Sequence, residues 1–433
     1  MEIKIYNYPA DDIQPLLKRN VASFDDIAET VSSIFAEVKA DGDEALIRLG
    51  KRFDCPTLES LEVTKEEFAE AEKNIDPTLK AALEVAAANI RKFHEAQRMH
   101  PIEVETTPGV VCRQKAVPIN TVGLYVPGGN APLFSTVLML AVPAQIAGCR
   151  TVVLCTPAGK DGKVNPAILV AARMAGVGKV LKAGGAQAIA AMTYGTKEVP
   201  KVDKIFGPGN RFVMVAKQMA SLQGTAIDMP AGPSEVMIVA DGDANPTFVA
   251  ADFLSQSEHG PDSQSILVTT SRDLAEKVAR QAADLVETLP RHEHIKKSLS
   301  KSSIIVAEND DQLMEIANRY APEHLIINHS LAEQLAEKVE NAGSVFLGQY
   351  ACESAGDYAS GTNHTLPTSG YATAYSGVNL DSFMKKITFQ SISASGIATL
   401  GPVIETLAEG ESLDAHKLAA TVRVDFVKNR KEK

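Results

Sequence analysis

Residues 151–209 run TVVLCTPAGKDGKVNPAILVAARMAGVGKVLKAGGAQAIAAMTYGTKEVPKVDKIFGPG, and their pattern decides the fold class. Short β-branched runs at 151–155, 179–185 and 202–209 predict strands, and the apolar spacing of 165–176 predicts a helix between the first two. Strands that alternate with helices indicate a parallel sheet covered on both faces. This stretch therefore predicts an α/β domain.

The same alternation continues along the chain. Further strands are predicted at 234–241, 264–271, 302–309, 324–330 and 344–348, with a long helix at 272–289. A chain of 433 residues has room for two such sheets, and the Gly/Pro-rich MPAGPSE stretch at 229–235 marks a crossing between them. Before residue 110 and after residue 380 the pattern is helical, with a capping box at Thr64 and Glu67.

Charge and composition argue against several classes of function. A net charge of −11 argues against nucleic acid or an anionic membrane as a partner, since both need a basic surface. No apolar run approaches the roughly 18 residues of a membrane span and the polar N-terminus lacks a signal-peptide core, so a cytoplasmic location is expected. Five scattered cysteines without a C-x-x-C pair predict neither a disulfide framework nor a Cys-rich zinc site.

Two possible metal ligands lie near the end of a predicted helix. Residues 247–259 have helical spacing, and Gly260-Pro261 ends the helix. Gln256 and His259 are three positions apart, so they share one helical face and can converge on a single point. Helix ends often carry polar residues, so this pair alone has little weight.

Three further segments could supply chemistry. Glu323-His324 lies at a predicted helix-to-strand junction, where two diverging side chains could serve different protons; a solvent-facing acid beside a half-buried histidine is the plain alternative. The predicted loop 353–364 offers Asp357 as an oxygen ligand and His364 as a substrate contact, or else uses its Asp and Asn for turns. Glu411 and His416 lie on or beside a C-terminal helix and, taken alone, favour a surface helix.

Cofactor chemistry is only partly visible in the residues. Gln256, His259, Asp357 and His416 offer two nitrogen and two oxygen ligands without a thiolate, a set that suits zinc or a similar ion. The G-x-G-x-x-G pattern of dinucleotide folds is not found. The Gly-rich turns at 184–187 and 207–210 could each hold a phosphate or be a tight turn without a ligand, so NAD does not follow from the residues alone.

Taken together, seven motifs resemble the histidinol dehydrogenase family over nearly the whole chain, least clearly over the first 100 residues. They are YVPGGNAPLFSTVLMLAVPAQIAGC (125–149), GGAQAIAA (184–191), VDKIFGPGN (202–210), DMPAGPSEV (228–236), SQSEHGPDSQ (255–264), PEHLI (322–326) and ESAGDYASGTNHTLPT (353–368). That family oxidises L-histidinol through the aldehyde to L-histidine, the last two steps of histidine biosynthesis, with two NAD and a bound zinc.

The resemblance implies a fold of two Rossmann-like parallel-sheet domains, with small N- and C-terminal helical segments that mediate a domain-swapped homodimer. The expected ranges are 1–25 for the N-terminal segment, 26–120 with 235–380 for the zinc and catalytic domain, 121–234 for the NAD-binding domain, and 381–433 for a C-terminal segment that reaches the partner chain.

The resemblance also assigns roles to residues. The zinc ligands are Gln256, His259, Asp357 and, from the partner chain, His416. The substrate contacts are these four residues with Ser234, His324, His364 and Glu411, of which Glu411 also reaches across. The NAD contacts are Tyr125, Gln187 and Asn210. The proton chemistry falls to Glu323 and His324, with one zinc held per subunit and two NAD consumed per turnover.

Rival interpretations remain open. A covalent route through a cysteine would use Cys112 or Cys149, but each has only an arginine beside it in sequence, which cannot act as a base. A relative that oxidises another alcohol, such as a sulfonated propanediol, would change the residues that contact the imidazole and amine. A zinc hydrolase, with Glu323 driving water onto an ester or amide, and a non-catalytic metal-binding subunit are the rivals from other classes.

Overall fold

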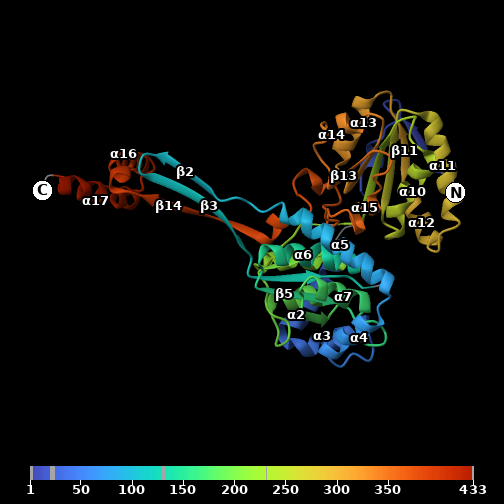
Figure 1. Ribbon diagram of the computed structural model, residues 1–433, viewed down its shortest axis with the longest axis horizontal. Coiled ribbons are helices and arrows are strands. Elements are labelled where there is room, and N and C mark those ends of the chain that lie inside the picture. The colour runs from blue at the N-terminus through green and yellow to red at the C-terminus, as the bar shows by residue number, and fades with distance from the viewer. Residues whose placement is uncertain (1–2, 20–24, 129–131, 231, 432–433) are drawn as a thin grey trace. The chain divides into compact units, whose positions relative to one another are not determined.

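The computed structural model describes residues 3–19, 25–128, 132–230 and 232–431 (Figure 1). Gly129, Asn130 and Ala131 of the YVPGGNAPL motif, and Ala231 of MPAGPSE, lie outside these ranges. The chain divides into two compact units. The first contains residues 1–97 and 119–383, and the second contains 98–118 and 384–433.

A six-stranded parallel sheet organises one half of the first unit, in the order β1-β11-β10-β9-β12-β13. The strands are β1 (Ile5–Asn7), β9 (Glu235–Ala240), β10 (Gln264–Thr269), β11 (Ser303–Val306), β12 (His324–Asn328) and β13 (Ser344–Leu347). Both faces are covered, since alternate residues of β9 enter two different cores. The covering helices are α1 (Gln14–Leu17), α10 (Pro246–Ser255), α11 (Arg272–Val286), α12 (His292–Leu299), α13 (Asp310–Tyr320), α14 (Ala332–Ala336) and α15 (Glu353–Tyr358).

A five-stranded parallel sheet organises the other half, in the order β6-β5-β4-β7-β8. Its strands are β4 (Thr121–Tyr125), β5 (Thr151–Thr156), β6 (Lys179–Lys182), β7 (Lys204–Phe206) and β8 (Ala226–Ile227). The helices after these strands are α6 (Phe134–Ala147), α7 (Pro166–Met174), α8 (Gly185–Tyr194) and α9 (Arg211–Leu222). The parallel sheets predicted from 151–209 and from 234–348 are therefore confirmed.

The N-terminal helices pack on the five-stranded sheet. They are α2 (Asp25–Asp41), α3 (Asp43–Phe53), α4 (Lys65–Asn74) and α5 (Pro77–Glu95), and the predicted capping box of Thr64 and Glu67 begins α4. Val31 and Leu46 share one hydrophobic core with Tyr125 and Val153. The sequence assigned 26–120 to the domain of the other sheet; apolar periodicity predicts a buried face but does not tell which sheet that face covers.

The second unit is an antiparallel sheet with two helices. Its strands are β2 (Ile102–Thr107), β3 (Val110–Pro118) and β14 (Met384–Ile392), in the order β14-β3-β2, and its helices are α16 (Ala394–Gly410) and α17 (Asp414–Lys431). The helical pattern expected before residue 110 and after residue 380 is therefore wrong for β2 and β14. The expected N-terminal segment likewise contains β1, which pairs with β11.

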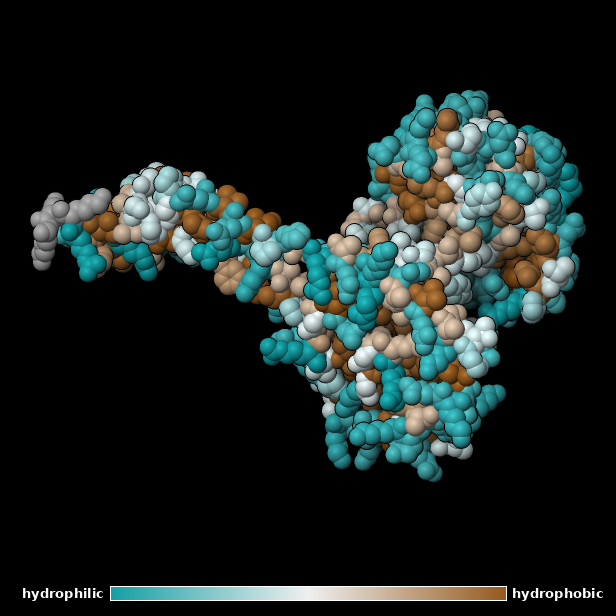
Figure 2. Space-filling model, in the orientation of Figure 1, coloured by the Kyte–Doolittle hydropathy of each residue, from teal (hydrophilic) through white to brown (hydrophobic). Residues whose placement is uncertain are grey.

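Hydrophobic side chains remain exposed on the second unit, as the brown surface in Figure 2 shows. They are Ile102, Val104, Ile387, Phe389 and Ile392 on the strands and Val403, Leu407, Leu413, Leu418, Val422 and Phe426 on the helices or the turn between them. A three-stranded sheet with so many uncovered apolar side chains buries little of its own surface. No helix within the described ranges is long and apolar enough to cross a bilayer.

Candidate active site at the amino edge of the six-stranded sheet

His324 is the first residue of β12 and lies at the centre of the candidate site. It is 2 % exposed. Its Nδ1 lies 2.9 Å from Gln256 Nε2, and its Nε2 lies 3.3 Å from Asp357 Oδ1. The first contact suits an imidazole Nδ1 that accepts from the glutamine amide, and the second is an ion-pair distance without hydrogen-bond geometry. The structure thus brings together three residues that were predicted from segments far apart in sequence.

Glu323 lies beside His324 and is also buried. One carboxylate oxygen, Oε2, accepts a hydrogen bond from the Glu235 backbone N–H at 2.9 Å and lies 3.7 Å from His324 Nδ1. Burial raises the pKa of Glu323. Burial lowers the pKa of His324, but the negative charges of Glu323 and Asp357 outweigh that effect and raise it. Two titratable groups are therefore close together and shielded from water.

Gln256 and His259 follow α10 in a short 3₁₀ turn rather than in the continuous helix predicted over 247–259. Gln256 is buried, and with its Nε2 directed at His324 its Oε1 has no hydrogen-bond partner among the described residues. His259 caps the turn, donating its N–H to the Gln256 carbonyl at 3.2 Å, and is exposed. A buried amide oxygen without a partner is a candidate ligand for a divalent cation.

The site is incomplete within this unit as a metal centre. Over the described ranges, no group of three His, Cys, Asp or Glu side chains could hold a metal ion. The predicted contributors Glu411 and His416 belong to the second unit, where both are exposed at the end of α16 and in α17.

The segment that contains Asp357 and His364 is better ordered than the predicted loop 353–364, because it begins with α15. His364 Nδ1 donates to the Asp357 backbone carbonyl at 2.9 Å, and His364 Nε2 lies 3.0 Å from Thr136 Oγ1. Ser234 immediately precedes β9 at the same amino edge as His324. His364 thus lies next to Asp357 in space, and Ser234 lies next to Glu235 in the chain.

Glu353, which begins α15, was not among the site residues predicted from the sequence. Its side chain is 2 % exposed, burial raises its pKa to about 8, and its Oε2 has no hydrogen-bond partner among the described residues. The negative charge of Glu353 also acts on His324. Glutamates between a strand and a helix are common in sequences. Only the burial of Glu353 near His324 marks it as a candidate site residue.

A second candidate site is a cavity of about 1060 Å³ at the carboxyl edge of the five-stranded sheet. Tyr125 ends β4, Gln187 lies in the first turn of α8, and Asn210 precedes α9; all three line the cavity. Tyr125 Oη accepts from Gly185 N at 3.0 Å, and Gln187 Nε2 donates to Asp54 Oδ2 at 3.4 Å.

Backbone geometry adapts this cavity to a phosphate-bearing ligand. The N-termini of α8 and α9 both reach its wall, and the partial positive charge of a helix N-terminus favours a negative charge there. Gly207 has φ +133°, and a Cβ there would lie 2.0 Å from the Tyr125 carbonyl oxygen, so only glycine fits. Asn210 Oδ1 caps α9 by accepting hydrogen bonds from Phe212 N and Val213 N. Asn210 therefore has a structural role that needs no ligand.

The two cysteines of the covalent alternative are poorly placed for it. Burial raises the pKa of Cys149 to about 11, so its thiolate is disfavoured at neutral pH. Cys149 precedes β5, at the opposite edge of the sheet from the cavity. Cys112 belongs to β3 of the second unit.

Comparisons with known proteins agree with one another. The family model described as histidinol dehydrogenase matches residues 17–424. Histidinol dehydrogenase of Bacteroides thetaiotaomicron is 56% identical over 98% of this chain and 100% of its own length, and that of Escherichia coli strain K12 is 51% identical over 96% of each. The crystal structure of the Elizabethkingia anophelis enzyme superposes with a TM-score of 0.96 at 48% identity, covering 98% of this chain and 99% of that one. A match of this extent shows that the chain belongs to the histidinol dehydrogenase family, a family of oxidoreductases.

Proposed function

We propose that this chain oxidises L-histidinol through L-histidinaldehyde to L-histidine, consuming two NAD per turnover. Family membership supports the substrate. The observation that carries the chemistry is the buried His324, held between Gln256 Nε2 and the Asp357 carboxylate and in contact with Glu323. Such a group can exchange a proton with an alcohol that is brought to the amino edge of the sheet.

His324 and Glu323 divide the proton transfers. Hydride leaves the alcohol carbon only as the O–H proton is removed, and His324 takes that proton in the first oxidation. The second oxidation needs water to add to the aldehyde, and the Glu323 carboxylate accepts a proton from that water. His324 again takes a proton when the gem-diol loses its hydride, so no covalent bond to the chain is needed.

The residues present fit a zinc ion. Gln256 Oε1, His259, Asp357 and His416 of the partner subunit would hold it. When bound, zinc supplies coordination positions for the imidazole and amino nitrogens of histidinol and so fixes the substrate's orientation. Ser234, His364 and the partner subunit's Glu411 would contact the substrate. A cation bound to Asp357 would partly neutralise that carboxylate, so the carboxylate would raise the pKa of His324 less than it does alone. A base that works near neutral pH requires this smaller rise.

The cavity at the five-stranded sheet is the proposed NAD site. Its volume and the two helix N-termini suit a ligand with a pyrophosphate. Tyr125, Gln187 and Asn210 are the proposed contacts. When bound, NAD supplies the hydride acceptor.

A homodimer with shared active sites accounts for the exposed apolar side chains of the second unit and for the missing fourth ligand. Mixing inactive His416→Ala chains with inactive His259→Ala chains should then restore part of the activity, because one site in each heterodimer has all of its ligands. Heterodimers that are verified by mass and remain inactive would argue for a site within one chain.

NADH absorbance on mixing the purified protein with L-histidinol and NAD tests the proposal. We expect two NADH per histidinol, with histidine as the product. A zinc hydrolase would give no NADH, and a relative that oxidises another alcohol would give NADH with that alcohol but not with histidinol.

A further inference from the structure

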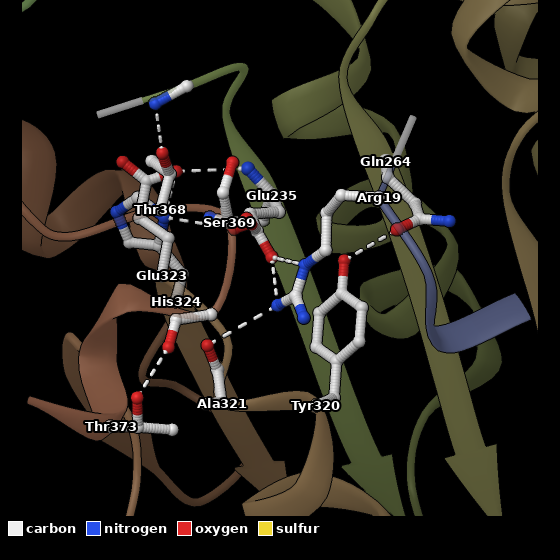
Figure 3. Close-up of polar contacts among 12 residues, drawn as sticks. Arg19, Glu235, Gln264, Tyr320, Ala321, Glu323, His324, Thr368, Ser369 and Thr373 are labelled. Carbon is white, nitrogen blue, oxygen red and sulfur yellow. Dashed lines mark hydrogen bonds and ion pairs between the residues drawn. The ribbon is translucent and has the colours of Figure 1, made fainter. Parts of the chain in front are cut away.

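Glu235, the first residue of β9, connects three segments behind the catalytic pair (Figure 3). It is 2 % exposed. Its backbone N–H donates to Glu323 Oε2 at 2.9 Å, and its side-chain Oε1 accepts from the backbone N–H of Ser369. Ser369 follows Thr368, whose hydroxyl accepts from the N–H of Gly232 in the segment that leads into β9. Glu235 thereby holds the Glu323 carboxylate and the loop beyond His364.

Arg19 supplies the counter-charge from the far end of the chain. Its Nε and Nη2 donate to Glu235 Oε2 at 2.9 and 2.5 Å, and Nη2 also lies 3.3 Å from the Ala321 carbonyl oxygen. The guanidinium lies 3.6 Å from the centre of the Tyr320 ring. Tyr320 and Ala321 are the residues at which α13 ends, just before Glu323. Arg19 therefore fixes both sides of Glu323: the strand that donates to it and the turn that precedes it.

Loss of the Arg19–Glu235 ion pair is expected to change the proton chemistry at Glu323 as well as the stability of the fold. Without Arg19, Glu235 is an uncompensated buried carboxylate next to a second one, Glu323. Unpaired buried charges move toward water or take up a proton, and either response displaces the β9 N–H from Glu323. His324 Nδ1 also lies 3.3 Å from the Glu235 backbone carbonyl oxygen, but Gln256 and Asp357 contact the ring as well, so its position depends less on this pair than that of Glu323 does.

We propose that Arg19 and Glu235 are positioning residues for the water-addition step, acting through the Glu323 carboxylate. This inference rests on the proposed function, in which Glu323 serves the second oxidation and His324 serves both. No contact found among the described residues joins Arg19 to Glu323 or His324. Replacing Arg19 is therefore expected to slow one of the two oxidations rather than to weaken substrate binding.

Single-turnover NADH formation from histidinol and from histidinaldehyde tests the proposal in the zinc-loaded enzyme. Arg19→Met should slow aldehyde oxidation at least about tenfold more than alcohol oxidation, with zinc content unchanged. Arg19→Lys, which keeps the charge but loses the two-pronged geometry, should recover part of that loss. Arg272→Met is the matched control, because Arg272 pairs with Glu276 on the exposed face of α11, and both of its rates should remain those of the wild type.

Equal slowing of the two steps in Arg19→Met and Arg19→Lys would overturn the proposal, because a merely structural role affects both. Unchanged rates in both variants would overturn it as well. If Arg19→Met does not fold, Arg19→Lys alone decides between selective and equal slowing. A wild-type enzyme that forms no NADH from histidinol would instead refute the proposed function. The wild type is therefore measured before any variant is compared with it.

Discussion

The two parallel sheets of the first unit share a strand order but carry their candidate sites at opposite edges. In the five-stranded sheet β4 is central, with β5 and β6 on one side and β7 and β8 on the other; in the six-stranded sheet β9 to β13 repeat this order, and β1 adds an edge strand beyond β11. Tyr125 is the last residue of β4 and Asn210 follows β7, both at the carboxyl edge, where open α/β sheets usually bind ligands. His324 and Glu235 instead begin β12 and β9, at the amino edge.

The difference follows from the helix ends that meet each edge. The N-termini of α8 and α9 reach the cavity of the five-stranded sheet, and their partial positive charge favours a phosphate. The amino edge of the six-stranded sheet receives helix C-termini instead: α10 ends just before Gln256 and α13 just before Glu323. Their partial negative charge favours a cation or a protonated imidazole. One topology can therefore separate an anion site from a cation and proton-transfer site.

The usual ligand position of the six-stranded sheet is occupied by its own side chains. His329, just after β12, lies 3.5 Å from Asp241 Oδ2 after β9 and 3.3 Å from Asp310 Oδ1 at the start of α13. Ser330 N donates to Asp241 Oδ2 at 2.7 Å. This carboxyl edge is thus closed by a polar cluster, which makes it a natural control for the amino edge.

Replacing the two histidines at opposite ends of β12 should give the largest contrast. His324→Asn should lower turnover by about 10³-fold, the effect of losing a general base, while zinc stays bound. His329→Asn should leave turnover within about twofold of the wild type. Steady-state kinetics and metal analysis check both variants. Loss of zinc in His324→Asn, or equal loss of turnover in both, would contradict the assignment.

Glu323→Gln should have the next largest effect and should act on one step. Glutamine keeps the shape but does not accept a proton from water, so aldehyde oxidation should slow by about 10²-fold and aldehyde should accumulate from histidinol. Product analysis by chromatography measures the ratio of aldehyde to histidine. Aldehyde oxidation at the wild-type rate would remove Glu323 from the mechanism.

At the five-stranded sheet the expected effect is on binding rather than on turnover. Gln187→Ala should raise the KM for NAD about tenfold, as the loss of one or two buried hydrogen bonds implies, and leave kcat little changed. The KM for histidinol is the internal control. A change confined to the KM for histidinol would place the cofactor elsewhere.

The smallest expected effect is the pH dependence at Asp54, which lines the same cavity. Burial raises the pKa of Asp54 to about 6, above its value of about 3.9 in an unfolded chain, so its stabilising contribution is present below pH 4 and lost as the pH rises through 6. Asp54→Asn should flatten the change in Tm between pH 5 and 7.5 by about 1 °C relative to the wild type. Glu59→Gln, at an exposed position, is the control; identical Tm changes in the wild type and Asp54→Asn would contradict a raised pKa at this carboxyl.

The sequence predicted the parallel sheets well because their strands are short β-branched runs buried on both faces. It failed for β2, β3 and β14, whose side chains are largely exposed and lack a clean alternation. The site residues were identified through family motifs, since Gln256, Asp357 and His324 meet only in three dimensions. Glu353, Glu235 and Arg19 escaped notice because nothing in their local sequence indicates burial or a distant ion pair.

Anomalous diffraction at the zinc edge, from crystals grown with zinc and histidinol, tests the central claim most directly. We expect one peak per subunit at the amino edge of the six-stranded sheet, within about 2.0–2.2 Å of Gln256 Oε1, Asp357 and His259, with His416 of the partner subunit completing the set. A peak at the carboxyl edge, on His329, Asp241 and Asp310, would contradict the proposed zinc site.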